Sequence, residues 1–140
     1  MGTLSPMKKE SSKVALVTGA SRGIGAAIAE RLAKDGYRVA CAGRSLTELK
    51  GVATTVGGLP VSLDLSSTES IRAALEQVRC AWGPIEVLVN NAGVAHSAQI
   101  SETTEEIWHH TLEINLTGGF TLAQACLPDM VSAGWGRMIF

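Results

Sequence analysis

Short apolar runs alternate along this sequence with segments whose apolar residues recur at helical spacing. The runs occupy residues 13–18, 37–43, 60–64, 85–90 and 137–140. Strict alternation of strands and helices predicts a parallel sheet covered by helices on both faces. The stretches VALV and VLV are continuously apolar, which is typical of strands that are buried on both sides. The predicted fold class is therefore α/β, a doubly wound parallel sheet.

Three of the intervening segments open on the pattern of a capping box, a hydroxyl residue followed three positions later by glutamate. The pattern occurs at Ser45 with Glu48, at Ser66 with Glu69 and at Thr103 with Glu106. The last of these predicts a helix through Trp108 and Leu112. A separate, longer helix is predicted over about 116–132, ended by Gly134.

The stretch VTGASRGIG joins the first predicted strand to the first predicted helix. A helix N-terminus offers free backbone N–H groups and the positive end of a dipole to an anion. We expect Gly19 to permit the tight turn, Gly23 to let a pyrophosphate approach the backbone, and Gly25 to let the helix pack on the strand. The spacing is GxxxGxG rather than GxGxxG, and such a turn taken alone can also be purely structural.

Three further motifs follow in order: Asp64-Leu65, NNAG at 90–93 and NLTG at 115–118. Together with the glycine turn, they resemble the short-chain dehydrogenase/reductase family in its short-subunit form, over residues 13–140. The resemblance implies a Rossmann-type fold, of which this sequence holds the N-terminal part up to the start of the fifth strand. It also implies cofactor contacts from Gly19, Ser21, Arg22, Gly23, Ile24, Asp64, Leu65, Asn91, Ala92 and Gly93.

The resemblance assigns these contacts to different parts of the cofactor. The glycine turn would line phosphates and ribose, Asp64 would bind the adenine amino group, and Leu65 would lie beside the ring. Residues 91–93 would contact the ribose, whereas Asn90 would be structural. Asn115 matches the family's catalytic asparagine, which holds a main-chain irregularity of a helix and a water that relays protons.

The family's catalytic serine and its YxxxK motif have no counterpart in this sequence, whose one tyrosine is Tyr37. We therefore expect a fragment of a longer reductase, with residues 1–140 inactive alone. A non-catalytic dinucleotide-binding module is the alternative. An epimerase or dehydratase is a third interpretation, and the spacing TGxxxGxG speaks against it.

The second predicted strand ends on Gly43, where selection of NAD requires a carboxylate about 20 residues past the glycines. Arg44 follows, and with Arg22 it would hold a ribose 2′-phosphate. Ser45 would add a hydroxyl group or cap the next helix. We therefore expect the cofactor NADP(H), although both arginines could also be ordinary surface charges. The resemblance favours hydride transfer to a 3-oxoacyl thioester or a related ketone, with steroids, sugars and small ketones as other substrates.

A formal net charge of −1 argues against partners such as nucleic acid or an anionic membrane. Residues 1–12 are polar, lack the core of a signal peptide and are expected to be a disordered leader before a single domain, 13–140. Three dispersed cysteines, Cys41, Cys80 and Cys126, favour reduced apolar residues in a cytoplasmic protein. We expect no metal at His96, His109 and His110. The family resemblance implies a homo-oligomer formed through the helix at 116–132.

Overall fold

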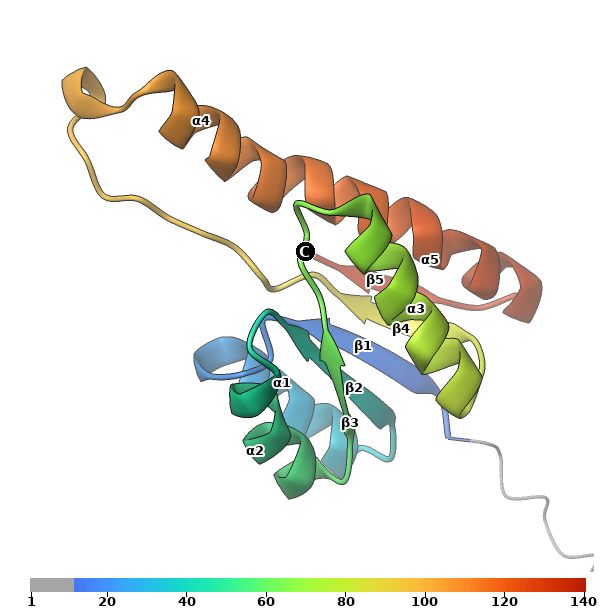
Figure 1. Ribbon diagram of the computed structural model, residues 1–140. Helices are drawn as coiled ribbons and strands as arrows, with labels where there is room; N and C mark the ends of the chain where they lie inside the picture. Colours follow the sequence, from blue (N-terminus) through green and yellow to red (C-terminus); the bar gives the residue numbers. More distant parts are fainter. Residues whose placement is uncertain (1–11) are drawn as a thin grey trace, which may run out of the picture.

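Five parallel strands form one sheet in the order β3-β2-β1-β4-β5 (Figure 1). They are β1 (Val14–Thr18), β2 (Arg38–Gly43), β3 (Leu59–Ser62), β4 (Ile85–Val89) and β5 (Arg137–Ile139). This computed structural model describes residues 12–140, so the predicted leader lies outside the described residues except for Ser12. The predicted α/β class and the strand that begins near residue 137 are confirmed.

Helices cover both faces of the sheet (Figure 1). Helices α1 (Gly23–Lys34) and α2 (Leu46–Val56) lie on one face, and α3 (Thr68–Trp82) and α5 (Gly119–Ala133) lie on the other. A long connection after β4 contains the short turn η1 (Ile100–Glu102) and leads into α4 (Glu105–Leu112). In Figure 1, α4 extends beyond the end of the sheet.

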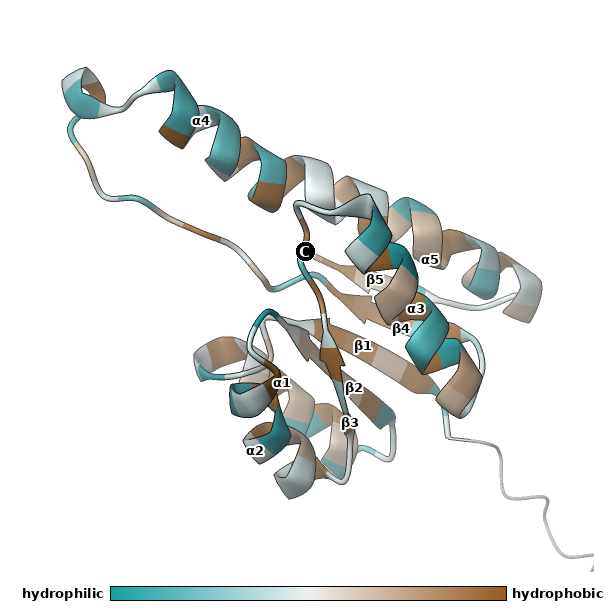
Figure 2. Ribbon diagram, viewed as in Figure 1, coloured by the Kyte–Doolittle hydropathy of each residue, from teal (hydrophilic) through white to brown (hydrophobic). Residues whose placement is uncertain are grey.

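The continuous apolar runs are explained by a core on each side of the sheet. Val14 and Leu16 point toward α3 and α5, whereas Ala15 and Val17 between them point toward α1 and α2. All four are at most 2% exposed, and β1 is coloured in shades of brown over most of its length in Figure 2. Since neither face meets water, no polar alternation is needed.

Only one of the three predicted helix starts is placed correctly. Ser45 caps α2, because its Oγ accepts a hydrogen bond from the N–H of Glu48 at 3.4 Å. The cap of α3 is Ser67, not Ser66. The cap of α4 is Thr104, not Thr103. Each error is one residue, and the neighbouring hydroxyl group makes the bond in both cases.

The two helices predicted on either side of residue 115 are one continuous helical run. Helix α4 passes into the π-helical segment η2 (Glu113–Gly118), and η2 passes into α5, which ends before Gly134. The predicted break between them is wrong. The main-chain irregularity that the family resemblance implied at Asn115 is present, since a π-helical turn inserts one extra residue into the α-helical repeat.

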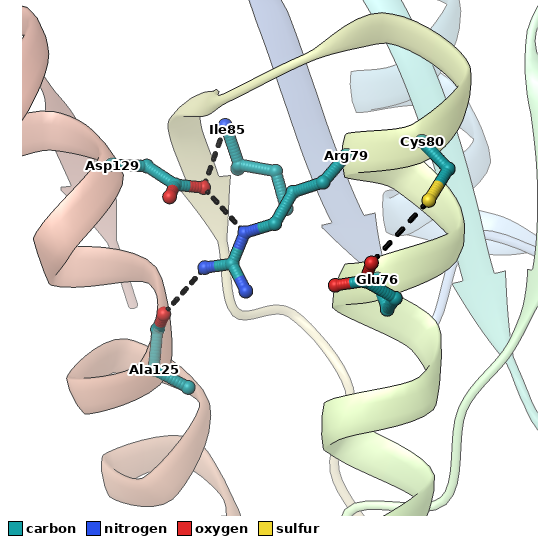
Figure 3. A network of polar contacts seen from close by, with 6 residues as sticks. All are labelled: Glu76, Arg79, Cys80, Ile85, Ala125 and Asp129. Carbon is teal, nitrogen blue, oxygen red and sulfur yellow. Dashed lines mark hydrogen bonds and ion pairs between the residues drawn. The ribbon is translucent and has the colours of Figure 1, made fainter.

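Arg79 and Asp129 tie α3 and α5 to the start of β4 (Figure 3). One carboxylate oxygen of Asp129, Oδ2, accepts from Nε of Arg79 at 3.0 Å and from the N–H of Ile85 at 3.0 Å. The guanidinium group also donates to the carbonyl oxygen of Ala125 at 2.8 Å. The Asp129 side chain is only 15% exposed, so this network fixes the C-terminal half of the helical run against the sheet.

Two of the three cysteines are core residues. Cys41 and Cys126 are fully buried, and burial raises their thiol pKa values to about 11 and about 12. Cys80 is exposed, and its thiol donates to the carboxylate of Glu76, which raises the thiol pKa. All three thiols of the described residues are outside disulfides, and Cys41 and Cys126 are apolar core residues, whereas Cys80 lies on the surface.

Across the part of the chain that the structure describes, none of the helices combines the length and the apolar character that crossing a membrane requires.

Candidate nucleotide-binding site

The strand order reverses between β1 and β4. From β1 the chain builds outward through β2 to β3, and it then returns to add β4 and β5 on the other side. The carboxyl ends of β1 and β4 therefore lie side by side, with the glycine turn after one and residues 90–93 after the other. In open α/β sheets, ligands bind at this reversal point.

The glycine turn leads directly into α1. Gly19 has φ +64°, a left-handed conformation that favours glycine. Arg22 is the N-cap residue of α1, and its side chain makes no capping hydrogen bond. The first turn of α1 contains no acidic residue. The first N–H groups of this helix are consequently available to an anion.

Gly25 packs against the turn that precedes it. A Cβ atom at this position would overlap the carbonyl group of Gly19 and lie 2.7 Å from Nδ2 of Asn91. That amide nitrogen donates to the carbonyl oxygens of Thr18 at 3.1 Å and Gly19 at 3.4 Å. Gly25 thus has the close-packing role expected from the sequence, and the Asn91 side chain is committed to holding the turn.

Thr18 links the two strand ends and was not singled out from the sequence. It is fully buried, and its hydroxyl oxygen accepts from the N–H of Ala92 at 2.9 Å. The same hydroxyl group can donate its one proton to Oδ1 of Asn90, 3.4 Å from Oγ1, or to the carbonyl oxygen of Val89, 3.5 Å from Oγ1. The N–H of Asn90 also donates to Ile139 of β5. Asn90 therefore has the structural role that the sequence analysis gave it.

A cavity of about 820 Å³ opens at this edge of the sheet. All twelve residues predicted to contact a cofactor line it: Gly19, Ser21, Arg22, Gly23, Ile24, Arg44, Ser45, Asp64, Leu65, Asn91, Ala92 and Gly93. Five more residues line it: Gly43, Glu48, Leu63, Val94 and Ile114. Such a volume is within the range of ligand pockets, and its combination of a close backbone turn with free helical N–H groups fits a dinucleotide.

Arg22 and Arg44 bring two positive charges to this cavity. Within residues 12–140, neither guanidinium group is in an ion pair. Gly43 ends β2 on the cavity wall without a carboxylate. The cavity therefore presents cations at the place where an NAD-selective site has an acid.

Asp64 lies in the loop after β3, close to Arg44. Its carboxylate accepts hydrogen bonds from the hydroxyl group of Ser66 at 2.7 Å and from the N–H of Ser66 at 2.9 Å. These two bonds are the main reason that the pKa of Asp64 is lowered, with smaller contributions from Arg44 and His110. The carboxylate is thus an ionised acceptor at neutral pH.

Asn115 does not line the cavity, but it holds a residue that does. Its Oδ1 accepts from the N–H of Val94 at 2.8 Å, and its Nδ2 donates to the carbonyl oxygen of Val94 at 2.7 Å. Both bonds come from the π-helical segment η2. The Asn115 side chain therefore fixes the segment after β4 against the helical run.

Tyr37 lies at the opposite end of the sheet from the cavity. It precedes β2, whose six residues separate it from the carboxyl ends of the strands. Six residues of extended strand span about 20 Å. Residues 12–140 therefore place no tyrosine at the cavity. They also contain no group of three His, Cys, Asp or Glu side chains arranged to hold a metal ion.

Comparisons with known proteins agree with the fold. A family model described as short chain dehydrogenase matches residues 13–140. The 3-oxoacyl-[acyl-carrier-protein] reductase MabA of Mycobacterium tuberculosis is 40% identical over 129 residues, 92% of this chain and 50% of that protein. D-threitol dehydrogenase of Mycolicibacterium smegmatis is 39% identical over 132 residues, 91% of this chain and 51% of that protein.

Solved structures give the same result. A variant of actinorhodin polyketide ketoreductase with NADPH superposes with a TM-score of 0.86 at 36% identity, covering 91% of this chain and 51% of that one. L-Sorbose reductase from Gluconobacter frateurii, complexed with NADPH and L-sorbose, gives 0.86 at 35% identity, with the same coverage of 91% and 51%.

The reversal point and its cavity define a Rossmann-type α/β protein. The chain belongs to the short-chain dehydrogenase family of oxidoreductases. It spans about half the length of the curated relatives that it matches.

Proposed function

We propose that this chain binds NADP(H) in the cavity and serves an NADP(H)-dependent oxidoreductase that acts on a carbonyl/alcohol pair. The observation that carries the proposal is the placement of Arg22 and Arg44 on the wall where Gly43 replaces an acidic residue. Arginine matches phosphate oxygens with its planar fork of donors. The free N–H groups of α1 and the turn at Gly19 suit the pyrophosphate.

The likeness to 3-oxoacyl-[acyl-carrier-protein] reductases favours a 3-oxoacyl thioester or a related ketone as the substrate. The bound nicotinamide would supply the hydride. In this chain, Asn115 would keep the residues after β4 in position beside the cofactor, through its two bonds to Val94. A non-catalytic dinucleotide-binding module is the second candidate, because residues 12–140 bring no tyrosine to the cavity.

Replacing Arg44 with alanine should weaken NADPH binding by about 10-fold to 100-fold, because a hydrogen bond to a charged group contributes roughly 1.5–3 kcal/mol. NADH has no 2′-phosphate, so its dissociation constant should barely change. Both cofactors can be titrated by nicotinamide fluorescence. Arg72→Ala is a matched control, since Arg72 is exposed on α3 and does not line the cavity. Equal losses for NADPH and NADH, or a wild-type chain that prefers NADH, would refute the assignment to NADP(H).

We also propose that the chain forms a homo-oligomer through the helical run. Its exposed large apolar residues recur at intervals of four, seven and eight: Trp108, Leu116, Phe120, Leu127 and Val131. Each is between 49% and 69% exposed. A continuous apolar stripe on a helical surface is typical of a packing face that meets another protein surface.

A charge in this stripe should therefore convert the oligomer to single chains. We expect Phe120→Glu to sediment as a monomer at concentrations where the wild-type chain sediments as a dimer or larger, because association would bury the carboxylate. Ser132→Glu is the control, since it adds the same charge at an exposed position outside the stripe. A monomeric wild-type chain, or a Phe120→Glu chain that stays associated, would exclude this interface.

A further inference from the structure

Glu48 lines the cavity next to the residues proposed to hold the cofactor's 2′-phosphate. It lies in the first turn of α2, and the same wall carries Arg44 and Ser45. Its position is well fixed, because its N–H donates to Oγ of Ser45 at 3.4 Å. Leu49, the next residue, is fully buried. The backbone of Glu48 is therefore fixed at the cavity wall, and its side chain is exposed there.

The Glu48 carboxylate is not neutralised by the protein. Within residues 12–140, it accepts no hydrogen bond, and no lysine or arginine lies within ion-pair distance. Arg44, four positions earlier, also has no carboxylate partner there. The two opposite charges thus line one wall without pairing, and both act on whatever the cavity binds.

These two charges act on only one of the two forms of the cofactor, and there they act in opposite directions. A ribose 2′-phosphate is attracted by Arg44 and repelled by Glu48. A ribose 2′-hydroxyl carries no charge, so neither side chain has a large electrostatic effect on the affinity for a nucleotide that bears it. Repulsion between exposed charges, screened by water and salt, changes a dissociation constant by about threefold to tenfold.

We propose that Glu48 is a specificity-determining residue that selectively weakens binding of the 2′-phosphate, an inference that rests on the function proposed above. The ratio of the NAD(H) dissociation constant to the NADP(H) dissociation constant is then smaller than Arg22 and Arg44 alone would make it. The Glu48 carboxylate lies on α2 rather than at the end of β2. It therefore reduces the preference for NADP(H) without making the chain prefer NAD(H).

The test compares two adenosine nucleotides that differ only in the 2′-phosphate, 2′,5′-ADP and 5′-AMP. Each is titrated calorimetrically into the 140-residue chain and its Glu48→Gln variant at low ionic strength. We expect Glu48→Gln to tighten 2′,5′-ADP binding by about threefold to tenfold and to change 5′-AMP binding less than twofold. The gain should shrink as salt is added, since exposed charges are screened. Glu69→Gln, in the first turn of α3 and away from the cavity, should change neither affinity.

Thermal unfolding of Glu48→Gln establishes that the variant is folded before its affinities are compared. An unchanged or weaker affinity for 2′,5′-ADP, or an equal gain for both nucleotides, would overturn the inference about Glu48. If the inference about Glu48 fails but 2′,5′-ADP binding still depends on Arg44, the proposed NADP(H)-binding function is retained. If the wild-type chain binds neither nucleotide, the proposed function itself fails, and the inference fails with it.

Discussion

Replacing Gly25 with alanine is expected to lower the free energy of unfolding by about 3 kcal/mol and to abolish nucleotide binding. The added Cβ atom would overlap the carbonyl group of Gly19. That carbonyl group accepts a hydrogen bond from Nδ2 of Asn91, and the same nitrogen would lie 2.7 Å from the added Cβ atom, so the turn has no free space on this side. To remove this overlap, α1 must shift away from the turn. That shift separates the N–H groups of α1 from the turn and so disrupts the anion site. Urea unfolding and NADPH titration measure the two losses.

Gly51→Ala is the matched control for this experiment. Gly51 lies inside α2, and a Cβ atom there meets nothing within 4 Å. Alanine should therefore stabilise the chain by about 1 kcal/mol through its higher helix propensity. A Gly25→Ala chain that is as stable as the wild type would mean that the turn tolerates a wider separation from α1.

Residues 1–140 with NADPH and a ketone, such as an acetoacetyl thioester, are expected to show no reductase turnover. Hydride transfer to a carbonyl carbon leaves an alkoxide, and a positioned acid that protonates it contributes about 10²–10⁴-fold to the rate. The only tyrosine of this sequence, Tyr37, lies at the wrong end of β2. NADPH oxidation that depends on the ketone is the quantity to measure.

Binding must be shown in the same sample for this result to be informative. NADPH fluorescence should report a saturable complex even though no product forms, and an active ketoreductase serves as the positive control for the assay. Saturable turnover by the 140-residue chain would show that another group donates the proton, and the ionised carboxylate of Asp64 is not suited to that task.

The sequence was most informative where physical constraints are local. Continuous apolarity in VALV is required of a strand buried on both faces, so β1 and its parallel neighbours were predictable. The first residues of the helices were less predictable from the sequence. At Ser66 and Ser67 either hydroxyl group could cap α3, and the choice follows from Ser66 being bound to Asp64. That bond is a local Asx turn between residues two apart, which the capping-box pattern alone does not reveal.

In the candidate site, too, some features were predictable from the sequence and others were not. The residues of the glycine turn and of 91–93 that the family resemblance assigns to the cofactor line one cavity. The hydrogen bonds that assemble them were not predicted, because the bonds from Asn91 to Thr18 and Gly19 join residues more than 70 positions apart. Sequence spacing likewise did not reveal that 105–133 is continuous, since a π-helical turn has no residue signature of its own.

Helix α4 contains no fully buried residue, so its eight residues have little core of their own, and an isolated helix of that length is marginal in water. Through η2 the same helical run reaches Asn115, which holds Val94 on the cavity wall. If a second copy covers the apolar stripe, its contact orders the helix that ends at this wall. Assembly and nucleotide affinity are then thermodynamically linked: each strengthens the other by the same factor, and the apparent affinity for the cofactor depends on protein concentration.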